Sequence, residues 1–550
     1  MTPTRRAVPL DARRQTAREG ALDRIFDAIV VGSGAAGGFA AKTLTENGLD
    51  TLVLEAGPYL DPAGDFPRPA AGDRLARIRA ALWRQPIQAR AASCKGYLKH
   101  LYVDDRENPY TVPTEKPFYW IRGRQVGGRL LTWACLSPRF SDFEFHGASH
   151  DGYGENWPLA YADLAPFYDK VETRLGLRGH TDGLPQLPDG RYMAGRELTP
   201  SEQEFKRLVG SRWPGRHVLQ ARVIRHRSGG RLLPLTDAES TGHLSLRPDA
   251  VVRRIMTDRR SGKATGVEFV DRVERTVRHA RGRLVFLCAS AFESVRVLLN
   301  SECDRHPEGL GGSSGALGRY ITDHLYLARS GPLPRTYRGP LPPEKDPYDF
   351  GANHGFYVPR FRNLHDRESE FVRGYSLCGA IGRTGLFWWV AAFGEMLARP
   401  ENRISLNRTR KDAWDVPVAH IECAHGENDR ALIADARHQV DEMTEAAGLR
   451  RGPWWGEHRL REMIGHKSFV DNGVFQPGFA IHELGGARMG KDAGSSVLDP
   501  FCRCWDAENV LVTDGACFVS SGYQNPTLTI MALTVRAAEQ AVADFDTIAS

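Results

Sequence analysis

A glycine-rich turn near the N-terminus has the residue types and the spacing of a dinucleotide-binding loop. It runs Gly32-Ser-Gly34-Ala-Ala-Gly37 and follows residues 26–31, a short apolar run typical of a buried parallel strand. The first glycine allows a tight turn, the second lets the backbone approach a diphosphate, and the third lets the next helix pack closely on the strand. That helix would present free N–H groups to the phosphates. The loop residues expected to contact the cofactor are Gly32, Ser33, Gly34, Ala36 and Gly37.

An acidic residue stands where such a unit needs one. The predicted second strand, residues 51–54, ends at Glu55, which lies 23 residues after Gly32. Its carboxylate can accept hydrogen bonds from the hydroxyls of a ribose and disfavours a 2′-phosphate, so the choice is between NAD and FAD. A glycine-rich turn without a ligand is the alternative. The order strand, glycines, helix, strand and acid favours a bound dinucleotide.

Three later clusters combine glycines with polar and aromatic residues. The first begins Arg122-Gly-Arg-Gln-Val-Gly-Gly128 and continues to Thr132-Trp133. Its paired glycines would let the backbone press against a flat or bulky group. The second runs His482-Glu-Leu-Gly-Gly-Ala-Arg-Met-Gly490. The third joins Asp514-Gly515 to Gln524-Asn-Pro-Thr527, which precedes an Ala-rich helical stretch.

Taken in this order, the motifs resemble those of the glucose–methanol–choline (GMC) oxidoreductases from Phe26 to about Val542. Within that family, the chain is similar to the sugar-oxidising branch. Residues 126–140 are similar to the flavin-contact segment of pyranose oxidases, and residues 157–190 resemble bacterial glucoside 3-dehydrogenases. The resemblance implies FAD as the cofactor. It also implies oxidation of a secondary alcohol of a sugar or glycoside to the ketone, with C3 favoured.

That reaction removes a hydroxyl proton and a carbon-bound hydride, and the flavin takes the hydride at N5. The protein must hold the alcohol and accept its proton, which suits a histidine beside a second polar side chain. By the resemblance, His482 is the base and Asn525 its partner across the hydroxyl. Taken alone, His482 would more often be a hydrogen-bonded core histidine. His324 matches a family Asp-His pattern and is expected to be structural, while Glu483 is expected to be solvated or paired with a cation.

The resemblance also assigns most of the cofactor contacts. Pyranose oxidases tether their flavin through a histidine immediately before the tryptophan, but this chain has Thr132 there, so we expect non-covalent FAD. Val252 matches the position whose backbone contacts the adenine. The helix that begins after Pro526 would stabilise negative charge on the flavin pyrimidine. Besides the loop residues and Glu55, the implied cofactor contacts are Arg124, Gly127, Gly128, Thr132, Trp133, Val252, Asp514, Gly515, Asn525, Pro526 and Thr527.

Three alternatives remain open for the function. The same chemistry could act on an aminocyclitol or a glycosylated natural product. The scaffold could serve a lyase that keeps FAD for structure, or the protein could be a flavin-loaded binding protein without turnover. The electron acceptor could be O2 or a redox carrier. Two departures from the family lie near the expected flavin site: Ala134-Cys135 follows the tryptophan, and Gly486 stands where threonine is usual.

The elements that must position these residues predict an α/β protein, α+β overall. We expect a Rossmann-like FAD-binding domain and a discontinuous substrate domain built on an antiparallel sheet. The expected limits are a disordered basic tail at 1–24, the FAD-binding domain at 25–190, 244–324 and 481–550, and the substrate domain at 191–243 and 325–480. Strands are expected at 250–252, 266–270, 284–290, 403–407 and 416–421, and helices at 291–300 and 427–447.

The overall composition fits an ordinary globular protein of several domains. The 550 residues are 41% hydrophobic and 25% charged, with a net charge of +6 and basic residues spread along the chain, which disfavours a nucleic-acid binder. No apolar run is long enough to cross a membrane. The nine cysteines form neither a disulfide framework nor a metal-binding spacing, so no metal is expected. No apolar segment follows Arg5-Arg6, so we expect no export signal and a cytoplasmic location.

Overall fold

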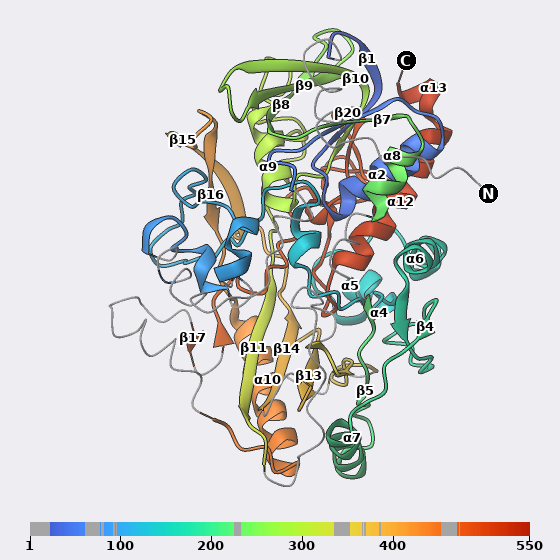
Figure 1. Cartoon of the computed structure of the whole chain (residues 1–550), viewed down its shortest axis with the longest axis vertical. Helices are drawn as coiled ribbons and strands as arrows, with labels where there is room; N and C mark the ends of the chain where they lie inside the picture. Colours follow the sequence, from blue (N-terminus) through green and yellow to red (C-terminus); the bar gives the residue numbers. More distant parts are fainter. Residues whose placement is uncertain are drawn as a thin grey trace, which may run out of the picture.

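The computed structural model describes residues 22–60, 78, 82–91, 94, 96–224, 233–334, 353–365, 367, 370–383, 387–452, 470–471 and 474–549. The expected N-terminal tail lies almost wholly outside these residues. Two sheets dominate the described part, one in the upper and one in the lower half of the view (Figure 1). No helix in the described ranges has both the length and the apolar character that crossing a membrane requires.

The upper sheet has eight strands and collects distant parts of the chain (Figure 1). Its parallel centre has the order β20 (Ala507–Val512), β10 (Val277–Leu287), β1 (Ile25–Val31), β2 (Thr51–Leu54) and β7 (Leu244–Arg247). At the edges, β19 (Arg503–Cys504) pairs with β20, and the antiparallel pair β8 (Ala250–Thr257) and β9 (Ala264–Asp271) joins β10. The expected Rossmann-like arrangement is confirmed. It gathers the carboxyl ends of the parallel strands at one edge, where such sheets bind ligands.

Helices cover this sheet. α2 (Ala35–Glu46) follows β1 directly, and both α12 (Thr527–Ala543) and α8 (Leu233–Ser240) pack against it. α12 also contacts α6 (Tyr161–Leu175). α9 (Ala291–Asn300) follows β10 and packs on β8. In Figure 1, the short helices α4 (Asp142–Phe145) and α5 (Gly147–Asp151) lie at mid-height, and α13 (Phe545–Ile548) lies beside the C-terminus.

The lower sheet has seven strands, and all of its pairings are antiparallel (Figure 1). Its order is β17 (Val470–Asp471), β18 (Val474–Phe475), β11 (His324–Pro332), β14 (Phe387–Glu395), β13 (Tyr375–Ile381), β12 (Phe356–Val358) and β5 (Leu219–Gln220). α10 (Glu427–Ala446) packs on β11 and β14, and α7 (Pro200–Arg212) on β13. The antiparallel sheet expected for the substrate domain is therefore present, while the domain limits stay a prediction.

Two small sheets complete the fold. β15 (Arg403–Lys411) pairs with β16 (Pro417–Glu422) beside α9, and β3 (Leu177–Gly179) lies between β4 (Met193–Ala194) and β6 (Val223–Ile224). Most expected elements occur within a few residues of their expected limits, with two clear differences. The strand expected at 284–290 already begins at Val277, because residues 277–281 pair with β9. The strand expected at 250–252 continues to Thr257, because Arg253 and Arg254 pair with Glu268 on β9 and keep polar residues in the strand.

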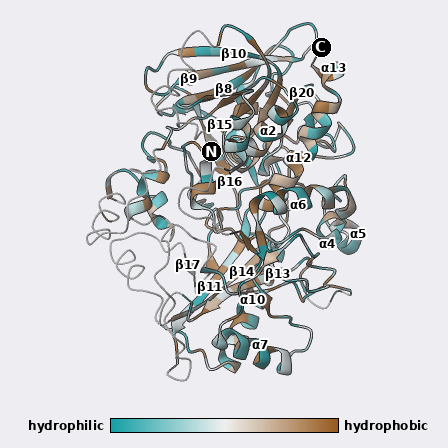
Figure 2. Ribbon diagram, turned by 45° about the vertical axis from the view of Figure 1, so that its right-hand side comes forward, coloured by the Kyte–Doolittle hydropathy of each residue, from teal (hydrophilic) through white to brown (hydrophobic). Residues whose placement is uncertain are grey.

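Strands at the centre of both sheets are deeply buried. Every residue of β2 and of β13 is buried. In Figure 2, hydrophobic residues concentrate in the strands, and hydrophilic residues lie on outer helices such as α6 and α7. The loops that follow the strands therefore start from rigid, well-packed supports, which can hold functional side chains in fixed positions.

Candidate active site

A cavity of about 320 Å³ lies at the carboxyl ends of the parallel strands. Residues that follow β1, β2, β10 and β20 form its walls together with segment 121–134 and the start of α12. The predicted cofactor and catalytic residues that line it are Gly32, Ser33, Gly34, Ala36, Glu55, Arg124, Gly128, Thr132, Trp133, Val252, His482, Asp514, Gly515, Asn525, Pro526 and Thr527. Two predicted residues, Gly37 and Gly127, lie outside this lining. The fold thus brings the separate sequence motifs to one cavity.

The glycines of the loop are required by backbone packing. Gly32 has a φ of +95°, and a Cβ there would lie 2.4 Å from the carbonyl oxygen of Cys288. A Cβ at Gly37 would lie 1.9 Å from the carbonyl oxygen of Gly32, which is the close helix–strand approach expected of this glycine. Gly34 faces the second glycine segment, because a Cβ on it would lie 3.9 Å from Cα of Gly128. A Cβ at Gly128 would in turn lie 3.0 Å from Cα of Gly34, so side chains at Gly34 and Gly128 would fill the space where the two segments meet.

Ser33 ties the loop to the acid and to the second glycine segment. Its backbone N–H and its hydroxyl both donate to Oε2 of Glu55, at 3.0 and 2.6 Å. Oε1 of Glu55 accepts from the N–H of Gly57 at 2.9 Å, and the N–H of Gly127 donates to the Ser33 hydroxyl at 3.0 Å. Burial raises the pKa of Glu55, against these hydrogen bonds and the charge of Arg124. A carboxylate offers about four acceptor positions, so about one remains for a ribose hydroxyl.

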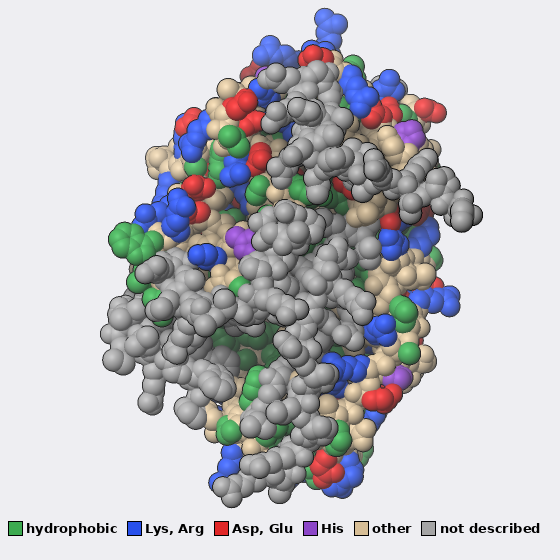
Figure 3. Space-filling model, viewed as in Figure 1, with side chains coloured by type: hydrophobic (Ala, Val, Ile, Leu, Met, Phe, Trp, Pro, Cys, Tyr) green, Lys and Arg blue, Asp and Glu red, His purple; other side chains and the backbone are tan. Residues whose placement is uncertain are grey.

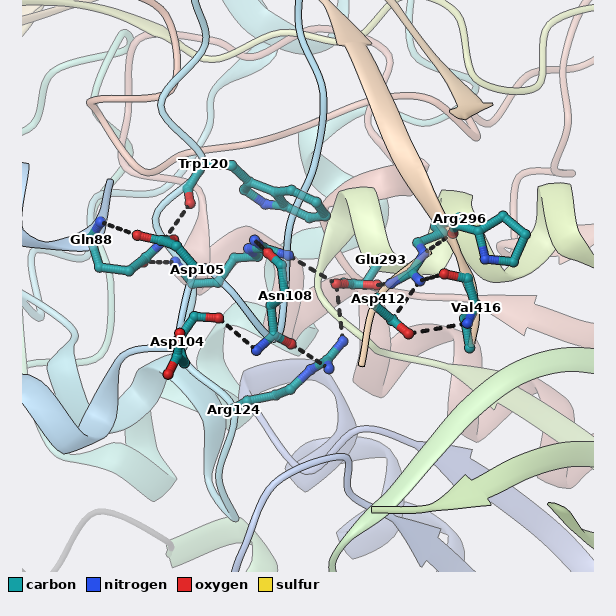
Figure 4. A network of polar contacts seen from close by, with 12 residues as sticks. Gln88, Asp104, Asp105, Asn108, Trp120, Arg124, Glu293, Arg296, Asp412 and Val416 are labelled. Carbon is teal, nitrogen blue, oxygen red and sulfur yellow. Dashed lines mark hydrogen bonds and ion pairs between the residues drawn. The ribbon is translucent and has the colours of Figure 1, made fainter. Parts of the chain in front are cut away.

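A buried network of charges holds Arg124 at the cavity wall (Figure 4). Arg124 donates to Oδ1 of Asn108 at 2.6 Å and pairs with Glu293, on α9, at 3.2 Å. Glu293 also pairs with Arg122 and with Arg296. Burial alone would raise the pKa of Glu293, but the three arginines lower it to about 2. The carboxylate therefore stays charged and fixes the two arginines that line the cavity.

The Asp-Gly and Asn-Pro-Thr motifs stand at two helix starts. Asp514 accepts from a backbone N–H of the 3₁₀ turn Gly515–Cys517 at 3.0 Å, and the hydroxyl of Ser294 donates to it at 2.5 Å. Burial raises the pKa of Asp514 to about 6. Pro526 and Thr527 begin α12, whose first N–H groups lack partners within the helix. The positive end of α12 therefore lies at the cavity wall and favours negative charge there.

His482 and Asn525 meet at the cavity wall, although 43 residues separate them in the chain. Nε2 of His482 lies 3.3 Å from Nδ2 of Asn525. In this arrangement the two groups can share one alcohol hydroxyl. The amide N–H would donate to its oxygen, and the bare ring nitrogen would accept its proton. Oδ1 of Asn525 is buried and has no hydrogen-bond partner among the residues that the structure describes.

The other side of His482 is held by the start of β11. Nδ1 of His482 lies 3.1 Å from Nδ1 of His324. The carboxylate of Asp323 accepts hydrogen bonds from the backbone N–H groups of Gly478 at 2.8 Å, Ala480 at 3.1 Å and His482 at 3.0 Å. His324, which was expected to be structural, therefore contacts the predicted base directly.

The surroundings of His482 keep it uncharged. Enclosure at the cavity wall lowers the pKa of His482 well below 6.5, and His324 and Arg129 lower it further. Arg129 belongs to the 3₁₀ turn Gly128–Thr132 and donates to Oε2 of Glu483 at 2.6 Å. Glu483 is thus paired with a cation, which is one of the two environments expected from the sequence.

Aromatic side chains stand next to His482. The ring of Phe393 lies 5.4 Å from that of His482, and Tyr326 lies 5.0 Å from Phe393, between centroids. Phe475 and Phe479 stack at 4.1 Å, and both contact Tyr326. Tyr326, Phe393 and Phe479 are only half-buried. Hydrophobic side chains are visible in the region of β11 on the face drawn in Figure 3. We call Tyr326, Phe393, Phe475 and Phe479 the aromatic wall.

The residues of the cavity fit FAD. The meeting glycines leave a cradle that Cβ atoms would fill, and α12 offers N–H groups at its start. Arg124 is fixed at the wall, and Asn525 keeps a buried carbonyl oxygen without a partner in the described part of the chain. A Rossmann-like sheet with such a cavity and a histidine–asparagine pair defines a dinucleotide-dependent oxidoreductase.

The family follows from the sequence comparison. Residues 26–326 match the amino-terminal GMC oxidoreductase domain, and residues 398–534 match the carboxy-terminal one. The chain therefore belongs to the GMC oxidoreductase family. The proteins of this family are flavoproteins that bind FAD and oxidise CH–OH groups, and this protein is such an oxidoreductase.

Curated relatives are similar to this chain along almost their whole length. The 2-methyl-1,2-propanediol dehydrogenase of Mycolicibacterium austroafricanum is 26% identical, over 93% of this chain and 94% of its own. The paromamine 6'-oxidase of Streptomyces fradiae is 26% identical, over 95% of this chain and 92% of its own. The C-glycoside 3-oxidase of Arthrobacter globiformis is 23% identical, over 94% of each chain.

Solved structures share the fold. The formate oxidase of Aspergillus oryzae superposes with a TM-score of 0.66 at 15% identity, over 95% of this chain and 99% of its own. Pyridoxine 4-oxidase of Mesorbium loti superposes with a TM-score of 0.61 at 17% identity, over 94% of this chain and 99% of its own.

Three features of the site were missed from the sequence. The aromatic wall comes from three strands and a loop, and nothing in its local sequence marks it. The link from Arg122 and Arg124 to Glu293 joins residues about 170 positions apart. The hydrogen bonds from the backbone of residues 478–482 to Asp323 were also missed, although Asp323 belongs to the Asp-His pattern noted in the sequence.

Proposed function

We propose that the protein oxidises a secondary alcohol of a sugar or glycoside to the ketone, with C3 favoured, and that His482 is the base and Asn525 holds the alcohol oxygen. The observation that carries this proposal is the convergence of Nε2 of His482 and Nδ2 of Asn525, 3.3 Å apart, on the cavity that the predicted cofactor residues line. The aromatic wall supports a ring-shaped substrate, because the apolar C–H face of a sugar can pack on aromatic rings.

When bound, FAD supplies the acceptor for the hydride that leaves the alcohol carbon. The chain supplies positioning and proton transfer. The amide of Asn525 donates to the alcohol oxygen and orients it, and Nε2 of His482 takes the hydroxyl proton as the C=O bond forms. The lowered pKa of His482 keeps the ring neutral beforehand, so one of its two nitrogens is free to accept a proton. The start of α12 stabilises negative charge at the cavity wall.

The names of the relatives support this substrate class. One is the C-glycoside 3-oxidase described above, and another is the fructose dehydrogenase large subunit of Gluconobacter japonicus, which is 25% identical. A second candidate is the same chemistry on an aminocyclitol-containing compound. It is supported by paromamine 6'-oxidase and by the 6'''-hydroxyparomomycin C oxidase of Streptomyces lividus, each 26% identical.

We further propose that FAD is held without a covalent bond. Thr132 lines the cavity at the position where pyranose oxidases carry the tethering histidine. Its hydroxyl donates to the backbone carbonyl of Arg129 at 3.3 Å. A threonine side chain has no ring nitrogen with which to form the tether, so the contacts of the loop, Glu55 and Arg124 would have to retain the cofactor.

Anaerobic reduction of the flavin tests the substrate class. The FAD-loaded protein is mixed without oxygen with glycosides, free sugars, aminocyclitols and small aliphatic diols, and the products are identified by NMR. We expect a glycoside to bleach the flavin and its 3-deoxy analogue to fail. Bleaching by aliphatic diols alone would contradict the proposal, and bleaching by aminocyclitols alone would favour the second candidate. Adding oxygen or a redox dye to the reduced protein then identifies the acceptor.

A further inference from the structure

The contact between His482 and His324 bears on the protonation of the base. Their Nδ1 atoms are 3.1 Å apart, and the rings meet edge to face with centroids 4.9 Å apart. A hydrogen bond between two ring nitrogens needs one proton, because one nitrogen donates and the other accepts through its lone pair. One of the two histidines therefore carries a proton on Nδ1, and the other does not.

Only one of these arrangements leaves His482 able to act as a base toward the cavity. If neutral His482 donates from Nδ1, its Nε2 is bare and can take the proton of an alcohol. If His324 donates instead, neutral His482 carries its proton on Nε2, where the substrate would have to deliver another. The Nδ2 atom of Asn525, 3.3 Å from Nε2, favours the first arrangement, because an amide N–H can donate to a bare nitrogen and not to another N–H.

We propose that His324 is a positioning residue: by accepting the Nδ1 proton of His482, it fixes the tautomer in which Nε2 of His482 is free to act as the base. This inference rests on the proposed role of His482. In the reaction, the O–H bond of the alcohol breaks and an N–H bond forms at Nε2, while the Nδ1 proton stays on His482. The imidazolium that results keeps its Nδ1–H directed at His324, so the same contact stabilises the charged base.

His324 is suited to accept a proton in a hydrogen bond without taking a charge. It is 1% exposed, and burial lowers its pKa to about 3, although the backbone of Gly522 raises it. His324 is therefore neutral at working pH. A carboxylate at this position would raise the pKa of His482 through its charge. A neutral ring instead orients His482 and leaves its pKa low.

The residue before His324 fixes the backbone of the base. The buried carboxylate of Asp323 accepts hydrogen bonds from three N–H groups of residues 478–482. Ile481, directly before His482, has a φ of +62°, which a β-branched residue rarely adopts. Such strain persists only where the surroundings over-determine it, and the hydrogen bonds to Asp323 lie on both sides of Ile481. Asp323 thus fixes the backbone of His482, and His324 fixes its ring.

The other charged and polar groups near His482 are engaged elsewhere. Arg129 pairs with Glu483, and Asp323 is used by backbone N–H groups. Asn525 faces Nε2 and not Nδ1. His324 is therefore the described group that partners Nδ1.

Three variants test the proposal in the FAD-loaded protein. His324→Leu removes the acceptor at similar volume, and His324→Asn places an amide oxygen near the former Nδ1 and so keeps an acceptor. His425→Leu is the matched control, because burial also lowers the pKa of His425, to about 4, but its charged neighbours are Arg399 and Arg430.

We expect His324→Leu to slow anaerobic flavin reduction by about 10- to 100-fold, because an unpaired buried N–H disfavours the working tautomer roughly 5- to 150-fold. The apparent affinity for the substrate should change less than threefold. His324→Asn should recover a large part of the rate, and His425→Leu should match the parent.

Nitrogen NMR separates tautomer selection from a loss of packing. With ¹⁵N in the histidine rings, a bare nitrogen and an N–H nitrogen give distinct signals, and those of His482 are the signals lost in His482→Ala. In the resting parent we expect a bare Nε2 and a protonated Nδ1. In His324→Leu we expect a substantial population with the proton on Nε2, and in His324→Asn the parent pattern.

Several results would overturn the proposal. One is a resting parent with a protonated Nε2. Another is a His324→Leu protein with the parent spectrum and a rate within threefold of the parent. If His324→Leu loses the rate but His482→Ala keeps it, His324 is itself the base and the proposal is wrong. If no sugar or glycoside reduces the flavin, the proposed function fails, and the spectra alone still decide which tautomer His324 selects.

Discussion

Glu55 accepts two hydrogen bonds from Ser33, one from its backbone and one from its hydroxyl. The same hydroxyl accepts from the N–H of Gly127, so the acid at the end of β2 is joined to both glycine segments. Glu55 therefore has two tasks. It can offer an acceptor position to a ribose, as we propose, and its hydrogen bonds hold the loop that would surround the diphosphate.

Replacing Glu55 should weaken FAD binding much more than it slows the chemistry. A charge-assisted hydrogen bond to ribose is worth about 1.5–3 kcal/mol, so Glu55→Ala should lower the affinity for FAD by roughly ten- to a hundredfold. Ser33→Ala is the comparison, because it breaks the link to Gly127 and leaves the carboxylate in place, and we expect a smaller loss. FAD titration of the apoprotein measures both. If Glu55→Ala binds FAD as tightly as the parent, Glu55 does not bind the ribose and the prediction is wrong.

Acid treatment should release the flavin. Because Thr132 cannot form the histidyl tether, we expect the purified protein to be yellow and its FAD to appear in the supernatant after acid precipitation. The supernatant is identified by chromatography against authentic FAD. Colour that stays in the protein pellet would disprove non-covalent binding.

Much of the cofactor site could be predicted from the sequence, because local rules carry it. Gly37 is dictated by a backbone contact with Gly32 within one strand–turn–helix unit, and the positive φ of Gly32 belongs to the tight turn of the same unit. The contact of His324 with His482 could not be predicted in this way. It depends on how β11 of the antiparallel sheet meets a loop 158 residues later, and no local pattern reports that distance. Packing of distant segments, rather than propensity, decides such contacts.

The aromatic wall illustrates the same limit. Tyr326 and Phe393 face each other because the register of β11 and β14 pairs them, and a shift of one strand by one residue would place the two rings on opposite faces of the sheet. The sequence predicted neither strand, and their register comes from the whole sheet. The aromatic contacts around His482 were therefore less predictable than the glycine-rich loop.

The rate of flavin reduction should fall at acidic pH only below the pKa range of an ordinary histidine. The pKa of His482 is lowered well below 6.5, so the base stays neutral as the pH falls through 6.5 and loses function only at lower pH. The anaerobic rate of flavin reduction should therefore keep its plateau at pH 6.5. Asp323, whose pKa burial raises to about 7, is the neighbour to control for. An acid limb near pH 7 that disappears in Asp323→Asn would belong to Asp323, whereas one that persists in this variant would contradict the lowered pKa of His482.

Arg129 should matter both for stability and for the pKa of the base. Arg129→Met leaves the buried Glu483 without its cation, which should cost about 1.5–3 kcal/mol of unfolding free energy. It also removes a positive charge that lowers the pKa of His482, so the acid limb of flavin reduction should move to higher pH. Adding Glu483→Gln should restore most of the stability. Denaturant unfolding measures the loss of stability. If flavin reduction slows at the same acidic pH in Arg129→Met as in the parent, the predicted effect on the pKa of His482 is wrong.

Asn525→Ala should lower the rate in a way that alkaline pH does not repair. The amide holds the alcohol oxygen and does not take its proton, so raising the pH supplies nothing that the variant lacks. Anaerobic reduction between neutral and alkaline pH measures this. A recovery as large as that of a variant without the base would show that Asn525 takes part in the proton transfer.

The central claim is that His482 accepts the proton of the alcohol, and anaerobic stopped-flow reduction of the flavin in His482→Ala tests it most directly. Removing a general base typically costs about 10²–10⁴-fold. We expect a loss of this size in a variant that retains FAD, with partial recovery at high pH, where hydroxide or an ionised alcohol replaces the base. Reduction within threefold of the parent across this pH range would contradict the claim and place the base elsewhere.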